Sequence, residues 1–164
     1  LPNGDFAFTT LRNFVLSSWA LLMWQRLATS SDEQLSAIAG KAVKEARYHR
    51  EHAADWVVRL GDGTDESTRR MARALERLWP YCAELFDADE TDREAAAQGL
   101  GPAWSALEEA WRADVSAVLD EAGMALPADS AFRSDGKRGR HSEHMGRLLA
   151  EMQYLHRAFP GGVW

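Results

Sequence analysis

The stretch SDEQLSAIAGKAVKEARYHREHAADWVVRL occupies residues 31–60 and repeats apolar side chains at the three- and four-residue spacing of one helical face. Ser30 and Glu33 predict a capping box at its start, in which each side chain bonds the other residue's backbone amide. Gly61 supplies the left-handed position that ends many helices, and Thr64 is the expected N-cap of the next helix. The apolar stripe consists of Leu35, Ile38, Ala39, Ala42, Ala46, His49, Ala53, Trp56, Val57 and Leu60.

The same periodicity predicts four more helices. After a loop over residues 1–5, one helix covers residues 6–28, and a second follows Thr64 with a kink or break at Pro80. A third covers residues 103–122, and the last starts near His141. Residues 87–101, with one helical turn, and residues 123–140 are expected to be loops. Without alternating strand patterns or internal repeats, the sequence predicts an all-α helical bundle in a single domain, residues 1–164. The apolar stripes are Leu11, Phe14, Val15, Trp19, Leu22 and Met23; Met71, Leu75, Leu78, Trp79, Cys82 and Phe86; Trp104, Leu107, Trp111, Val115, Val118 and Leu119; and Met145, Leu148, Leu149, Met152, Leu155 and Phe159.

Composition excludes several classes of protein. The chain has 164 residues, 46% of them hydrophobic, and a net charge of -6, so it can bury a core but lacks the clustered cations of general nucleic-acid binders. Its longest early apolar run, residues 17–24, is too short to span a membrane, and no secretion signal is apparent. Cys82 is the single cysteine, which favours a reducing, cytoplasmic setting; we interpret it as a small core residue, since no catalytic partner for it is evident.

A carboxylate on an apolar stripe raises the question of a metal centre, and Glu45 lies at or beside the core in this pattern. Di-iron bundles use Glu-x-x-His on two helices and one Glu on each of two others, but no histidine here has an acid three residues before it. A tyrosine stands at the position of the missing histidine, three residues after an acid, in two places: Tyr48 after Glu45 and Tyr154 after Glu151. Residues 6–28 contain no acid, and Ser17 and Ser18 occupy the middle of that predicted helix. We therefore predict no metal and no catalytic residue in this chain, and treat Glu45, Tyr48, His49, Glu151 and Tyr154 as degenerate metal-site positions.

These residues also have interpretations that involve no di-iron centre. Glu45 is expected to be a buried or half-buried acid paired with Lys41, Arg47 or a histidine. The pairs His49/His52 and His141/His144 could form a zinc site if their helices met, or be ordinary polar and capping residues.

One positive patch interrupts the acidic chain. Lys137, Arg138 and Arg140 lie in a glycine-containing loop directly before the last predicted helix, whose free amides favour anions. The patch is a candidate contact for a phosphate, such as those of coenzyme A, or for an acidic partner; a solvated loop is the alternative.

Seven short motifs together carry a resemblance to a known family. They are NGDFA (3–7), KEARYH (44–49), RLGDGT (59–64), LWP (78–80), ELF (84–86), GRHSEH (139–144) and LAEMQYL (149–155). Along its whole length the chain resembles the non-catalytic, ferritin-like C-type subunits of the phenylacetyl-CoA epoxidases, the multicomponent oxygenases of phenylacetate degradation. Chains of that family begin with further helices, so this sequence is similar to their C-terminal two-thirds, and we expect it to behave poorly when expressed alone.

The resemblance implies a partnership rather than an independent enzyme. It implies a cytoplasmic complex in which a sister subunit of the same fold holds the di-iron centre and epoxidises phenylacetyl-CoA, with a reductase among the other subunits. This chain would support the sister subunit and border the coenzyme A region. Two alternatives stay open: an autonomous di-metal carboxylate oxidase with unusual ligands, and a stand-alone acyl-CoA-binding helical protein.

Overall fold

Helices make up the regular structure of the protein. The computed structural model describes residues 4–163, and within them there is no β-sheet, only an isolated bridge between Asp135 and Arg140. The predicted all-α fold is confirmed. The described residues divide into two compact units, residues 4–133 and residues 134–163, so the single domain over 1–164 stays a prediction. In the part of the chain described, no helix combines the length and the apolar composition needed to cross a bilayer.

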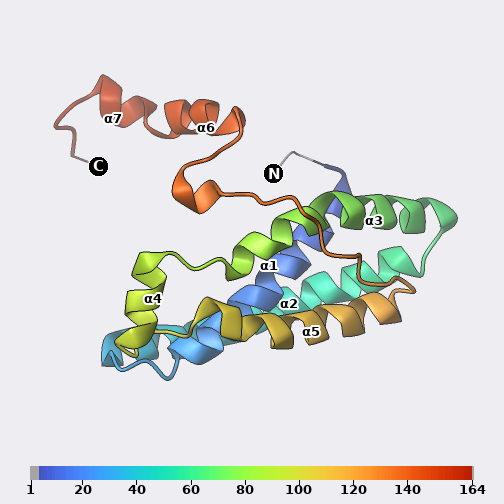
Figure 1. Ribbon diagram of the computed structural model, residues 1–164. Coiled ribbons are helices and arrows are strands. Elements are labelled where there is room, and N and C mark those ends of the chain that lie inside the picture. The colour runs from blue at the N-terminus through green and yellow to red at the C-terminus, as the bar shows by residue number, and fades with distance from the viewer. Residues whose placement is uncertain (1–3, 164) are drawn as a thin grey trace. The chain divides into compact units, whose positions relative to one another are not determined.

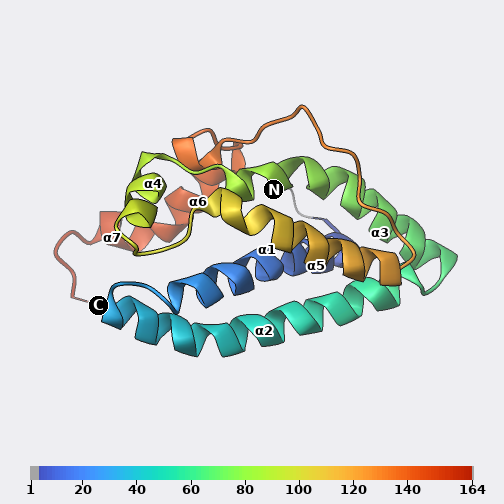
Figure 2. The ribbon, with the colours of Figure 1, turned by 60° about the horizontal axis from the view of Figure 1, so that its bottom comes forward.

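The larger unit is built on a long helical hairpin. Helix α1 (Phe6–Leu27) is followed by α2 (Glu33–Gly61), α3 (Asp65–Leu78), the 3₁₀-helix η1 (Trp79–Phe86), α4 (Glu90–Ala97), the 3₁₀-helix η2 (Trp104–Leu107) and α5 (Glu108–Glu121). Helix α1 contacts α2, α3 and α5 (Figure 1), and α2 runs along the lower edge of this unit in the view of Figure 2. The side of α2 away from α1 is therefore the outer edge on which several predicted site residues fall.

Side-chain caps fix where these helices begin. Asp5 accepts a hydrogen bond from the Phe8 amide at 3.0 Å, and it thereby confirms the predicted entry into the first helix, although residues 1–3 lie outside the described residues. Thr64 and Ser67 form a reciprocal capping box at the start of α3. The predicted box of Ser30 and Glu33 is wrong, because Asp32 is the N-cap of α2. Its carboxylate accepts from the Leu35 amide at 2.8 Å, and a charged acceptor suits the positive end of a helix.

The core of the larger unit lies between α1, α2, α3, η1 and α5. Trp111 is 1% exposed, stacks on Trp79 with ring centroids 5.7 Å apart, and meets the edge of Phe86 at 5.2 Å. Its indole N–H donates to the backbone oxygen of Val15 at 3.0 Å, which joins α5 to α1. Large side chains such as these supply most of the buried apolar area. Other fully buried side chains are Leu11, Phe14, Val57, Met71, Leu107, Val115 and Leu119.

The hairpin and α5 approach each other closely at the end of α2. A β-carbon placed on Gly61 would lie 2.6 Å from the backbone oxygen and 2.7 Å from the β-carbon of Ala122, which is the C-cap of α5. The Thr68 hydroxyl donates to the Gly61 oxygen at 2.7 Å. Gly61 is therefore required here for space. The predicted left-handed conformation at Gly61 is wrong, because the described glycines with positive φ are Gly99, Gly123, Gly139 and Gly161, and α2 ends with Asp62 as its C-cap.

The predicted break at Pro80 is confirmed, and its neighbourhood is more regular than expected. Helix α3 ends at Leu78 and the chain continues as η1, because Pro80 cannot donate a helical hydrogen bond. The loop expected over residues 87–101, with one helical turn, instead contains the eight-residue helix α4. This helix is stabilised at its start because the Asp92 amide donates to the Asp89 carboxylate at 3.0 Å and the Asp89 amide donates to the Asp92 carboxylate at 2.9 Å. The helix predicted over 103–122 is confirmed as η2 followed by α5.

A small set of contacts ties the end of α4 to the turn between α1 and α2. The Ser31 amide donates to the Gly99 oxygen at 2.9 Å, and the Ser31 hydroxyl donates to the Gln98 oxygen at 3.1 Å. Gly99 has a φ of 73°, a left-handed conformation that glycine adopts without strain. These bonds connect positions 67 and 68 residues apart in the chain.

The smaller unit consists of short helices. The 3₁₀-helix η3 (Gly136–Arg138) is followed by α6 (His144–Met152) and α7 (Tyr154–Ala158). The sequence predicts one continuous helix that starts near His141. This is wrong, because the helix begins at His144 and is interrupted at Gln153. Gln153, with φ −96° and ψ −2°, lies in the bridge region of backbone space and separates α6 from α7.

Candidate functional site

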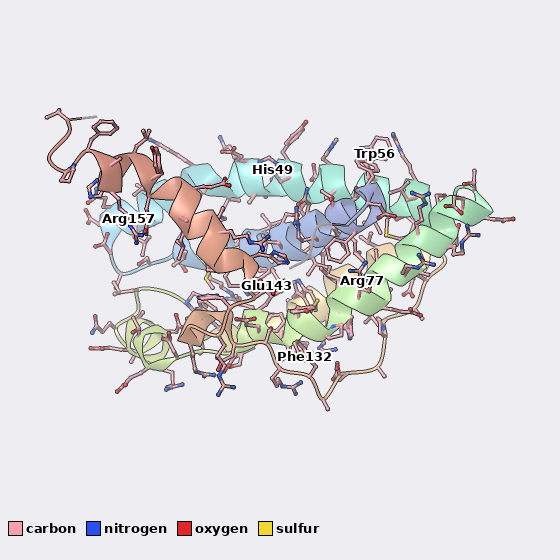
Figure 3. All side chains as sticks on the ribbon, turned by 90° about the horizontal axis from the view of Figure 1, so that it is seen from above. His49, Trp56, Arg77, Phe132, Glu143 and Arg157 are labelled. Carbon is pink, nitrogen blue, oxygen red and sulfur yellow. The ribbon has the colours of Figure 1, made fainter. Side chains whose placement is uncertain are left out.

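The predicted metal-site positions on α2 face water. The side chains of Glu45 and His49 are 79% and 60% exposed, and Glu45 Oε1 lies 3.6 Å from His49 Nε2. The Tyr48 ring stacks on His52 at a centroid distance of 6.0 Å and meets His49 edge-on at 5.8 Å. Figure 3 shows His49 and Trp56 on this same helix. Together Glu45, Tyr48, His49 and His52 form an exposed polar and aromatic patch, which we call the α2 patch.

The expectation that Glu45 lies at or beside the core is wrong. The buried residues of α2 are Ala39, Ala46, Ala53, Ala54, Val57 and Gly61, a narrower stripe than the sequence predicted. Ile38 and His49, which the predicted stripe included, are exposed. Small alanine side chains let α1 approach closely, so α2 buries only a thin strip and leaves Glu45 in water. The predicted pairing of Glu45 with a histidine is confirmed.

These residues depart from the ligand pattern of a di-iron bundle. Tyr48 stands three residues after Glu45, where the Glu-x-x-His pattern has an imidazole. Among the described residues there is no group of three or more His, Cys, Asp or Glu side chains that could hold a metal ion. Glu151 lies on α6 and Tyr154 begins α7; Tyr154 is 66% exposed. His141 and His144 belong to the smaller unit, whereas His49 and His52 belong to α2.

Two serines occupy the middle of α1, where a ligating acid would be needed. The Ser17 hydroxyl donates to the Phe14 backbone oxygen at 3.2 Å. Ser18 is 1% exposed, and its hydroxyl makes no hydrogen bond with any described residue. A buried, unpaired hydroxyl costs free energy, yet it is far less costly than an unpaired carboxylate at the same place.

The basic loop of the smaller unit is organised around an acid of its own. Asp135 accepts hydrogen bonds through its backbone oxygen from the amides of Arg138 and Arg140, at 3.2 and 3.1 Å. Its carboxylate accepts a hydrogen bond from Arg138 Nη1 at 3.2 Å, and one of its oxygens lies 4.0 Å from Arg140 Nε. A phosphate at Lys137, Arg138 and Arg140 would compete with this carboxylate, so the contact with coenzyme A stays a prediction.

Two arginines that the sequence did not single out connect elements of the larger unit. Arg50 of α2 forms a two-pronged ion pair with Asp114 of α5, with Arg50 Nε 3.2 Å from one carboxylate oxygen, and its guanidinium lies 5.6 Å from the Phe14 ring centroid. Both side chains are half-buried. Each stands beside an apolar stripe, and nothing in the sequence indicates that the two helices would bring them together.

Arg112 is the second of these connecting residues. It donates to Glu108 and Asp129, both at 2.9 Å, and lies 5.8 Å from the Trp79 ring centroid. Burial acts to lower the pKa of Arg112, but the hydrogen bonds and charges of Asp129 and Glu108 outweigh it and raise that pKa above its ordinary value. The ion pair of Arg112 with Asp129 therefore holds the segment after α5 against that helix.

Cys82 is buried, as predicted for a core residue, but it lies in η1 rather than in a continuous third helix. Burial raises the pKa of its thiol from 9.0 to about 12, and the charge of Arg112 opposes this only in part. Because the thiolate is the nucleophile, and the thiolate fraction at pH 8 falls about 1,000-fold between a pKa of 9.0 and one of about 12, native Cys82 is expected to react with a disulfide reagent at pH 8 at least about 30-fold more slowly than the urea-unfolded chain, since a more basic thiolate is also more nucleophilic. The rate of thiol release, followed by absorbance, measures this.

The raised pKa also predicts the direction of a pH effect. The unfolded chain releases the thiol proton near pH 9.0 and the folded chain near pH 12, so the free energy of unfolding is expected to fall as pH rises through this window. The variant Cys82→Ala should lose that part of the pH dependence. Equal labelling rates in the folded and unfolded chains would contradict this assignment.

Comparisons with known proteins agree with the resemblance. The family model described as phenylacetic acid catabolic protein matches residues 1–164. A curated relative, the C component of the 1,2-phenylacetyl-CoA epoxidase of Escherichia coli strain K12, is 46% identical over 163 residues. That match covers 99% of this chain and 66% of the relative, so the chain spans just under two-thirds of the relative's length.

Proposed function

Because the chain belongs to the phenylacetic acid catabolic protein family, we propose that it is a non-catalytic helical subunit of a phenylacetyl-CoA epoxidase complex. Its place in the complex is that of a support for a sister subunit of the same helical fold. The sister subunit holds the di-iron centre and receives electrons from a reductase. The complex acts in the cytoplasm on phenylacetyl-CoA, and this chain borders the coenzyme A region with Lys137, Arg138 and Arg140.

One observation carries the proposal that this chain is not catalytic. The Glu-x-x-His pattern of di-iron bundles is not met at Glu45 or Glu151, because Tyr48 and Tyr154 stand three residues after these acids. A reactive metal centre needs its ligands held rigidly inside a shaped, water-poor site.

Reconstitution with the catalytic subunit of the same organism tests this function. The expected result is a stable complex on size exclusion, with epoxidation of phenylacetyl-CoA that depends on this chain. Glu45→Gln should keep both assembly and activity within about 2-fold, since an exposed pair contributes little. If Glu45 were a ligand of an autonomous di-metal oxidase, the same change would abolish activity and metal content.

Metal and ligand analyses of the separate chain distinguish the two alternatives. After incubation with ferrous iron and desalting, we expect no stoichiometric iron; about two irons per chain would establish the oxidase instead. Saturable binding of acyl-CoA by the chain alone, weakened in Lys137→Gln and Arg140→Gln, would support the stand-alone acyl-CoA-binding protein.

A further inference from the structure

The turn that joins α2 to α3, at one end of the larger unit in Figure 1, contains an aspartate followed directly by a glycine. The chain has two such dipeptides, Asp62–Gly63 in this turn and Asp135–Gly136 in the smaller unit. Because glycine has no side chain, its amide nitrogen is unhindered and can approach the carboxyl group of the residue before it. The structure holds the two dipeptides in opposite ways.

The peptide group between Asp62 and Gly63 is not held at either end. Asp62 is the C-cap of α2, with φ −97° and ψ 17°, and its own amide donates to the Val58 oxygen at 2.9 Å. Its carbonyl accepts no hydrogen bond from a described residue, the Gly63 amide donates none to one, and its carboxylate has no partner among them. This peptide group can therefore turn over without breaking a hydrogen bond, since glycine tolerates the change in φ.

The packing of the turn requires the glycine. A β-carbon on Gly63 would lie 2.7 Å from the Arg59 backbone oxygen and 2.7 Å from the Ser67 hydroxyl oxygen. The first atom belongs to the main chain of α2, and the second is held in the capping box with Thr64. Position 63 thus excludes a side chain, and an unhindered amide after Asp62 is the consequence.

The peptide group between Asp135 and Gly136 is held in place. The Asp135 backbone oxygen accepts from the amides of Arg138 and Arg140, and its carboxylate accepts from Arg138 Nη1 at 3.2 Å. Turning this peptide group over would break both backbone bonds. Moving the carboxyl group toward the Gly136 nitrogen would break the bond to the guanidinium as well.

We propose that Asp62 is a site of spontaneous isomerisation to isoaspartate, and that the fold protects Asp135 from the same reaction. The Gly63 nitrogen attacks the side-chain carboxyl carbon of Asp62. A C–N bond forms, the C–OH bond of the carboxyl group breaks, and water leaves with the amide proton. A water molecule then opens the resulting succinimide ring by breaking the bond between the Gly63 nitrogen and the original main-chain carbonyl carbon of Asp62. One water is released and one is consumed, and no electrons are transferred.

The product lengthens the main chain at the start of α3, because the chain then runs through the side-chain methylene of residue 62. The Ser67 amide donates to the Thr64 hydroxyl at 3.2 Å, and the Thr68 hydroxyl donates to the Gly61 oxygen across the turn at 2.7 Å. An added methylene between Gly61 and Thr64 displaces these partners. The amides of Ser67 and Thr68 should therefore exchange with deuterium at least about 3-fold faster in the isoaspartyl form.

Incubation of the full chain at physiological temperature, followed by peptide mapping, measures both sites at once. A mildly acidic pH favours the protonated carboxyl group that loses water. Heavy-oxygen water labels each aspartate that has passed through the ring, and electron-transfer fragmentation distinguishes isoaspartate from aspartate. We expect isoaspartate to form at Asp62 at least about 5-fold faster than at Asp135. In the urea-unfolded chain the two rates should agree within about 2-fold, since each aspartate precedes a glycine.

The variant Asp62→Glu is the matched control. It keeps the charge at the end of α2, but its ring closure would need a six-membered ring, so label at position 62 should fall at least about 10-fold. The reaction needs no partner subunit, and its failure would leave the proposed function standing. Equal rates at Asp62 and Asp135 in the folded chain, or undiminished label in Asp62→Glu, would overturn the proposal. Unchanged exchange at Ser67 and Thr68 in the isoaspartyl form would overturn the loosening of α3.

Discussion

Replacing Trp111 with alanine is expected to lower the free energy of unfolding by about 3–5 kcal/mol. The indole is 1% exposed and packs between Trp79 and Phe86, so its removal leaves a cavity as well as losing buried apolar area. The Val15 oxygen also loses its hydrogen-bond donor inside the core. Urea unfolding followed by circular dichroism would measure the change, which is a large share of the stability of a typical domain.

Trp111→Phe separates packing from hydrogen bonding. This variant keeps an aromatic ring in the same space but cannot donate to Val15, so we expect a smaller loss of about 1–2 kcal/mol. It also remains measurable if Trp111→Ala proves too unstable to purify. A loss of less than about 1 kcal/mol in both variants would show that α5 is not held to α1 through this side chain.

Two glycines of α2 are expected to respond to alanine with opposite signs. Gly61→Ala places a β-carbon 2.6 Å from a backbone oxygen that cannot move independently of α5, and we expect a loss of about 1–3 kcal/mol. Gly40 lies in the same helix, and a β-carbon there meets no atom within 4 Å. Gly40→Ala is therefore expected to gain about 0.5–1 kcal/mol, since alanine favours the helix.

The matched pair makes this prediction easy to contradict. Both variants add one methyl group to the same helix, and thermal unfolding of the two measures the difference directly. Gly61→Ala with an unfolding temperature equal to that of Gly40→Ala would show that the end of α2 is not tightly packed against Ala122.

The sequence predicted the features that depend on local periodicity and on proline. The stripe from Leu107 to Leu119 identified the buried face of α5, and Pro80 identified the end of α3, because both signals act within a few residues. The exposure of Glu45 could not be predicted in this way. It depends on how narrowly α1 and α2 pack along Ala39, Ala46 and Ala53, which is a property of the helix pair and not of one helix.

The candidate site was predictable in its residues but not in its surroundings. The missing imidazoles and acids are visible in the sequence, whereas the pairing of Arg138 with Asp135 results from the turn between them. The interruption at Gln153 gives no strong signal either, since glutamine favours helices and the apolar spacing continues across it. The link from Arg50 to Asp114 joins residues 64 positions apart, beyond any local pattern.

The contact between Ser31 and Gly99 has a consequence for how this fold can diverge. Its shorter bond runs between two main-chain groups, so it survives almost any replacement of Ser31 except proline, and only the hydroxyl bond to Gln98 would be lost. Glycine at position 99, by contrast, is favoured by its backbone angle. Homologous chains could thus accumulate unrelated side chains at position 31 and still inherit the same attachment of α4, provided that they retain a glycine, or an asparagine in its place, at position 99.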